Sequence, residues 1–404
     1  MTQQIAAQGS ACRTEETGRE EIPSSLWEEL PESCRESEGI YRPVVSLWKE
    51  ILFQFFRRKT AVLGLLLVIF TILFAAVGPL FCTHSYDEQS LPYVNTSPVL
   101  TVYQTGTEEY YATSSFKLVR MNEDGTLGET IRSKREDGMN KRYVFELNGE
   151  TYYLSYKTGS TGLQDASGSP IPTRKAWNKS YPLGTDGLGR DVLVRLMYGA
   201  RISMTVAFVA TLVTLLIGVL YGSISGYIGG TVDLVMMRIV DIISAIPLTM
   251  YVILIMVLFN NGGLISIIIA LGSVYWVDMA RVVRGEILTL KKREFVGAAH
   301  TMGSSTFYIL RRHLIPNALG PIIVTATMQI PSAIFTEAFM SFIGLGVSAP
   351  MASWGMMCND ALEMMQSAPY QLAFPAGAIC VAMFAFNFMG DGLRDAFDPQ
   401  LRKT

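Results

Sequence analysis

Residues 294–317 read EFVGAAHTMGSSTFYILRRHLIPN, a segment that is too polar to lie among lipid chains. It follows a cluster of basic residues and separates two long apolar stretches of the chain. The segment begins with an acidic residue, has small residues in its middle and ends in an apolar part that contains proline. The residues in question are Glu294, Ala298, Ala299, Gly303, Leu314 and Pro316. A segment of this kind is expected outside the membrane, where it can contact another protein.

The composition indicates a membrane protein with a soluble portion. Half of the residues are hydrophobic and only 17% are charged, whereas soluble proteins have roughly 25% charged residues. The formal net charge of −2 gives no reason to expect a nucleic-acid partner. The five cysteines are scattered without a CxxC pair, so neither a metal site nor a disulfide framework is expected.

Apolar runs predict an all-α polytopic protein with six transmembrane helices. A spanning helix needs about 20 apolar residues to cross a hydrocarbon core of about 30 Å. Runs without Asp, Glu, Lys or Arg cover residues 60–86, 202–232, 242–277, 314–336 and 364–390. The third run is too long for one span, and the turn sequence NNGG at residues 260–263 interrupts it. We therefore expect a helical hairpin there, with its first helix beginning before Asp241.

Basic residues in short loops predict the orientation, because they favour the cytoplasmic side. They gather before the first run and between the fourth and fifth spans, as Arg57, Arg58, Lys59, Arg281, Arg284, Lys291, Lys292, Arg293, Arg311 and Arg312. Residues 341–371 contain neither Lys nor Arg. Both termini and the loop 281–313 are therefore expected in the cytoplasm. The apolar stretch 338–359 is rich in Gly, Pro and Ser and is not counted as a seventh span.

The region before the first span divides into two parts. Residues 1–44 are mostly polar and are predicted to form a disordered cytoplasmic tail. Residues 45–82 hold an amphipathic helix, over 45–58, and the first transmembrane helix. The amphipathic pattern fits an interfacial helix lying on the inner membrane surface equally well as an ordinary packed helix.

A polar insertion at residues 83–185 separates the first two spans and is predicted to be a small extracytoplasmic β-rich domain. Asn148-Gly149 between two strand-like runs, 143–147 and 151–155, predicts a hairpin with a type I′ turn. Further strands are expected at 99–104, 109–113, 116–121 and 129–133, and a linker at 158–176. An exterior cap or docking surface is the favoured role, and shaping of a substrate entrance is the alternative.

Motifs for catalysis and for nucleotide binding are missing from the sequence. No GxxxxGK[ST] phosphate-binding loop occurs, and the three histidines do not form HExxH. We expect no enzymatic activity, cofactor or metal. Acidic residues near the apolar runs are expected at the ends of spans, which argues against an ion-coupled transporter: Asp186, Asp191, Asp233, Asp241, Asp278, Glu337 and Asp391.

Four stretches resemble one family, the C-type permease subunits of dipeptide/oligopeptide/nickel ABC importers. Residues 294–317 resemble the EAA loop that couples such permeases to their ATPases, with Gly297 in place of the usual Glu. The other three stretches are YPLGTDGLGRD with YGARIS (181–191 and 198–203), EA, SFIGLGV and SWG (within 337–355), and FNFMGDGLRD with DPQLR (386–395 and 398–402). The resemblance is dense over 181–402 and looser over 45–80. The loop alone would also fit an ordinary basic cytoplasmic loop.

The resemblance implies the ABC type I importer permease fold, with residues 186–404 as the permease core. It implies half of a translocation pathway for di- or oligopeptides in a bacterial plasma membrane. The implied partners are a homologous second permease, two ATP-binding subunits and an extracytoplasmic substrate-binding protein. The implied coupling loop is 291–317, where Ala298 and Ala299 allow close approach, Gly303 allows a sharp exit and Pro316 fits the first turn of the fifth span. Nickel or another small solute is an alternative cargo, and a membrane-anchored sensor is an alternative of another class.

Overall fold

The computed structural model describes residues 47–156, 162–258, 263–347 and 350–398. The predicted tail 1–44, most of the NNGG turn and the last residues of the motif at 398–402 lie outside these ranges.

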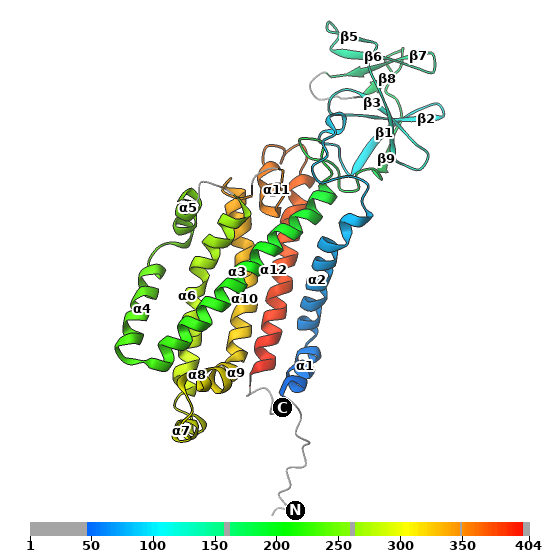
Figure 1. Ribbon diagram of the computed structural model, residues 1–404. Helices are drawn as coiled ribbons and strands as arrows, with labels where there is room; N and C mark the ends of the chain where they lie inside the picture. The colour runs from blue at the N-terminus through cyan, green and yellow to red at the C-terminus, as the bar shows by residue number, and fades with distance from the viewer. Residues whose placement is uncertain (1–46, 157–161, 259–262, 348–349, 399–404) are drawn as a thin grey trace, which may run out of the picture. The chain divides into compact units, whose positions relative to one another are not determined.

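The helical part confirms the predicted polytopic fold (Figure 1). Within the described ranges, five helices are long and apolar enough to cross a membrane, namely α2 (Lys59–Ala76), α3 (Val192–Ile228), α6 (Leu264–Leu290), α10 (Leu319–Phe342) and α12 (Tyr370–Phe397). A sixth candidate span is a helix pair, α4 (Gly230–Ser244) and α5 (Leu248–Leu258), which is bent by 86°. The chain is therefore a multi-pass membrane protein.

Two proline positions explain where the helices depart from the predicted runs. The charge-free run extends to residue 86 and the first transmembrane helix was expected within 45–82, but α2 ends at Ala76 and a short 3-10 helix, Gly78–Phe81, follows with Pro79 in its first turn. The bend between α4 and α5 falls at residues 245–247, because Pro247 disfavours a helical conformation at the residue before it. The predicted hairpin thus has a broken first arm.

Small residues hold α3 and α6 in close contact. Gly218, Gly222 and Gly226 follow one another at four-residue intervals on α3 and face α6. A Cβ atom at Gly222 would lie 2.4 Å from the carbonyl oxygen of Ala280, which is closer than real structures permit. Such small-residue contacts are typical of helix pairs in membranes. The two helices therefore pack as a tight unit.

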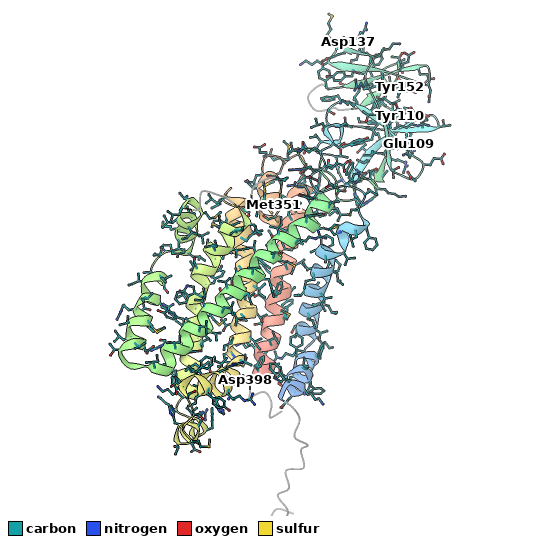
Figure 2. The ribbon with its side chains drawn as sticks, in the orientation of Figure 1. Glu109, Tyr110, Asp137, Tyr152, Met351 and Asp398 are labelled. Atoms are coloured by element: carbon teal, nitrogen blue, oxygen red, sulfur yellow. The ribbon has the colours of Figure 1, made fainter. Side chains whose placement is uncertain are left out.

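The β-rich region forms two antiparallel sheets (Figure 1). The first has the order β4-β3-β2-β1-β9, and its strands are β1 (Val99–Thr105), β2 (Glu108–Ala112), β3 (Leu118–Met121), β4 (Leu127–Ile131) and β9 (Thr173–Trp177). The second has the order β5-β6-β7-β8, and its strands are β5 (Arg135–Asp137), β6 (Arg142–Leu147), β7 (Glu150–Ser155) and β8 (Leu163–Gln164). Tyr110 and Tyr152, one from each sheet, belong to the same buried cluster (Figure 2).

The predicted hairpin is confirmed, whereas the predicted linker is partly wrong. Leu147 pairs with Glu150, and the two residues between them have φ angles of 52° and 82°, as a type I′ turn requires. Residues 158–176 contain β8 and most of β9 where they are described. Strand β9 pairs with β1 so that Val99 lies opposite Trp177. The polar sequence TRKAW concealed this strand, because it lies at an exposed sheet edge.

The structure shows that the amphipathic helix is packed, whereas its place on the inner membrane surface stays a prediction. Helix α1 (Leu47–Arg57) buries Ile51 and Phe55 in a cluster with residues of α2 and α12. Leu52, Phe53 and Phe56 remain exposed on it. One apolar side is therefore packed against the spans, and the other is exposed, as an interfacial helix would require.

Candidate functional site

The segment 294–317 folds as a chain of short helical pieces at the end of α6. These are α7 (Glu294–Thr301), α8 (Thr306–Ile309), a π-helical turn (Leu310–Leu314) and α9 (Ile315–Asn317), after which α10 begins. Pro316 was expected in the first turn of the fifth span. It lies instead in α9, because Ala318 interrupts the helix before α10.

Gly303 ends α7. It adopts a φ angle of 78° and donates its N–H to the His300 carbonyl at 2.9 Å, while Ser304 donates to the Ala299 carbonyl at 3.1 Å. This pair of bonds is the Schellman arrangement, which satisfies the last carbonyls of a helix and requires a left-handed residue. The chain therefore leaves α7 at a sharp and defined angle.

The inward side of the segment is apolar. Val296 and Ala299 are each 2% exposed and pack in one buried cluster with Tyr227 of α3 and Ile287 of α6. Leu314 is fully buried in the same cluster. Two of the six predicted loop residues, Ala299 and Leu314, are thus brought together against the ends of the long helices.

A polar contact also joins α7 to α3. The Tyr227 hydroxyl and the Nε2 atom of His300 lie 2.9 Å apart, in a hydrogen bond whose direction depends on the imidazole tautomer. Lys291 donates to the Tyr227 carbonyl, and its Nζ atom lies 5.2 Å from the centre of the tyrosine ring. The end of α3 is therefore fixed to the segment by both packing and polar contacts.

The outward side of the segment carries large apolar residues that the sequence reasoning missed. Phe307 is 71% exposed and Met302 is 78% exposed, and they are joined by Phe295 and Tyr308. The other four predicted residues are also exposed, namely Glu294, Ala298, Gly303 and Pro316. Large apolar residues in a segment too polar for lipid were the signal available in the sequence. We call the group Phe295, Ala298, Met302, Phe307 and Tyr308 the outer face.

The prediction that all acidic residues lie at the ends of spans is wrong for Asp278, and Glu337, five residues before the end of α10, is fully buried. Asp278 lies in the middle of α6. The Glu337 carboxylate accepts hydrogen bonds from Ser203 at 2.7 Å and from Ser341 at 2.8 Å. A carboxylate can be buried there because hydroxyl groups of α3 and α10 satisfy it.

The motif YPLGTDGLGRD builds an ion network at the start of α3. Asp186 accepts hydrogen bonds from the Arg190 Nε atom at 2.7 Å and lies 3.4 Å from the Arg195 Nε atom. Asp360, in α11 (Trp354–Asp360), lies 3.4 Å from a nitrogen of each arginine. Burial raises the pKa of Asp360, and the two guanidinium groups oppose this shift. Asp191 caps α3 by accepting from the N–H of Leu193 at 2.8 Å.

Known families match two parts of the chain. Residues 218–403 match the family described as the binding-protein-dependent transport system inner membrane component. Residues 46–98 match the N-terminal TM domain of oligopeptide transport permease C.

Three known proteins illustrate the similarity. The oligopeptide transport system permease protein OppC of Bacillus subtilis (strain 168) is 38% identical over 382 residues, which are 95% of this chain and 99% of that protein. The dipeptide transport system permease protein DppC of the same organism is 48% identical over 221 residues, 54% of this chain and 69% of that protein. The solved inward-facing MetNI methionine ABC transporter is 20% identical, with a TM-score of 0.43, over 50% of this chain and 96% of that chain.

Spans, loop and motifs together define a transport permease embedded in a membrane. The chain belongs to the family of binding-protein-dependent transport system inner membrane components.

Proposed function

We propose that this chain is the permease subunit of an ATP-driven importer of di- and oligopeptides. The similar proteins from Bacillus subtilis carry the names of oligopeptide and dipeptide permeases. The observation that carries the proposal is the segment 294–317, whose inward side is packed on α3 and α6 while its outer face is exposed. Such a segment can receive force from a second protein and pass it to the spans.

The proposed coupling begins when an ATPase subunit seats the outer face in a groove. Displacement of α7 moves Tyr227 and Ile287, which lie in its buried cluster, and with them the ends of α3 and α6. Because glycines hold α3 close against α6, the two helices move together. The far end of α3 carries Arg195, which lies 3.4 Å from Asp186 and 3.4 Å from Asp360 in the ion network. The movement therefore reaches the opposite end of the bundle.

The complete importer contains further subunits. Family membership implies a second permease, ATP-binding subunits and a substrate-binding protein in general. We propose that both termini and the loop 291–317 face the cytoplasm, with residues 186–404 as the permease core. The insertion 83–185 then faces outward, where it caps the complex or docks the binding protein.

Uptake into vesicles tests this function. The vesicles carry this chain, the second permease and the ATP-binding subunits. The binding protein is added outside the vesicles, together with the substrate. A labelled dipeptide, a labelled longer peptide and nickel are offered in parallel. ATP-dependent peptide uptake that disappears when this chain is omitted supports the proposal. Uptake of nickel alone contradicts the peptide cargo, and the absence of all uptake contradicts the proposed function.

A further inference from the structure

Two cavities lie along one side of α10. The first has a volume of about 630 Å³ and is lined by residues of α6, α10 and the end of α12. The second has a volume of about 680 Å³ and is lined by residues of α5, α6, α10 and α12. Asp278 and Gln329 line both cavities, so the two adjoin at this pair. Each volume is in the range of roughly 300–1,000 Å³ that small-ligand sites have.

Asp278 presents a carboxylate to both cavities from the middle of a span. Its side chain is 72% exposed. The Nη1 atom of Arg281 lies 3.9 Å from this carboxylate. Arg281 is engaged elsewhere, because its Nη2 atom bonds to Asp241 at 3.2 Å and to Ser244 at 2.8 Å. An ionisable side chain inside a span is costly and usually serves a function.

The surroundings of Asp278 favour a cation that also forms hydrogen bonds. The first cavity is lined by three carboxylates, including Asp398 at the end of α12 (Figure 2), and by one basic side chain, Arg394. One of the three, Asp395, is paired with Arg58. Gln329 is held beside Asp278 because its Nε2 atom donates to the Tyr275 carbonyl at 3.0 Å. The lining therefore presents carboxylate and amide oxygens, which accept hydrogen bonds, beside one guanidinium group.

We propose that Asp278 receives the protonated amine of the transported peptide during its passage along α10. A peptide carries an ammonium group at its amino terminus, and a lysine side chain offers the same chemistry. An ammonium has three donors and a positive charge, which match a carboxylate. This inference rests on the proposed function and names the part of the substrate that the permease contacts.

Matched peptide pairs in the vesicle assay test the proposal. One pair is trialanine with its N-acetylated form, and the other is Ala-Lys-Ala with Ala-norleucine-Ala. For each pair, the uptake ratio is compared between the wild-type importer and Asp278→Asn. The same binding protein serves both importers, so its own preference cancels. We expect the substitution to lower the preference for the amine-bearing peptide about two- to fivefold in at least one pair.

Two further variants separate charge from structure. Asp278→Glu keeps the charge and should retain the preference. Asp391→Asn removes an exposed carboxylate of α12 that lines neither cavity, and it should leave both ratios unchanged. A response in the first pair identifies the amino terminus as the contact, and a response in the second identifies the lysine side chain. Unchanged ratios in Asp278→Asn with intact peptide uptake overturn the role of Asp278 alone. Absence of peptide uptake by the wild-type importer overturns the proposed function itself.

Discussion

At the scale of single residues, two glycines of the loop differ in the backbone conformation that the structure requires of them. Gly303 has a φ angle of 78°, whereas Gly297 lies in the middle of α7 without a left-handed conformation. A Cβ atom at either position would meet nothing within 4 Å. Backbone conformation is therefore the main difference between the two positions. Comparing the same substitution at both positions isolates the effect of backbone conformation on α7.

Replacement of each glycine by alanine should have opposite effects on α7. Gly303→Ala should destabilise the end of α7 by about 1 kcal/mol, because L-residues disfavour a left-handed conformation. Gly297→Ala should stabilise α7 by about 0.5–1 kcal/mol. Hydrogen exchange of residues 294–304 measures both effects, and uptake should fall only in Gly303→Ala. Equal exchange in the two variants would contradict this account of Gly303.

The sequence set residues 294–317 apart as one polar segment but did not show to which side each of its residues turns. Ala298 and Ala299 were both expected at a close contact. Neighbouring residues on a helix point in different directions, so Ala299 is buried and Ala298 is exposed. The partner Tyr227 could not be predicted, because it lies some 70 residues earlier and meets His300 only through the tertiary fold.

At the scale of elements, the short helix α11 is attached to α3 by charge and by hydrogen bonds. Trp354 donates its backbone N–H to the Ser203 hydroxyl at 3.4 Å and its indole N–H to the Leu196 carbonyl at 3.0 Å. The ion network adds Asp360 at the other end of α11. The position of α11 therefore depends on the residues that begin α3.

Asp186→Asn should loosen this end of the bundle. The substitution keeps the shape of the side chain but leaves Arg190 and Arg195, both almost fully buried, with less negative charge. Loss of charge-assisted hydrogen bonds should lower the free energy of unfolding by about 1.5–3 kcal/mol. Thermal unfolding in detergent and hydrogen exchange of residues 354–360 measure the effect. Glu363→Gln, at an exposed carboxylate, is the control, and equal behaviour of the two variants would contradict a role for the network.

The long helices could be predicted from the sequence, whereas strand β9 could not. Continuous apolar runs identify spans because lipid admits few other structures. Strand β9 is polar, and its partner β1 lies some 70 residues earlier in the chain. Its pairing is set by the fold of the whole insertion, which no local pattern reveals.

At the scale of the whole molecule, the β-rich insertion begins and ends at one place. Val99 and Trp177 are opposite each other on β1 and β9. The flanking residues contact α12 independently, since the Tyr370 hydroxyl donates to the Thr96 carbonyl at 2.9 Å and Gln371 donates to Asn95 at 2.8 Å. The insertion can therefore be removed without separating the ends of the remaining chain.

Replacement of residues 100–176 by a short Gly-Ser turn should leave the membrane part intact. We expect the shortened chain to insert and to co-purify with the second permease in at least about half the wild-type amount, because the two ends remain adjacent. Size-exclusion chromatography of the complex measures this yield. A shortened chain that is lost from the membrane would show that the insertion supports the spans.

The central claim is that the outer face, formed by residues of both α7 and α8, receives the force that the ATPase supplies. Uptake and ATPase retention should be measured in vesicles with Ala298→Trp, which adds bulk at an exposed position. Met139→Trp, at a 96% exposed position in the β-rich region, is the matched control. The account predicts that Ala298→Trp stays in the membrane with the second permease but loses the ATP-binding subunits and uptake, whereas the control keeps both. Full ATP-driven uptake by Ala298→Trp would contradict the account.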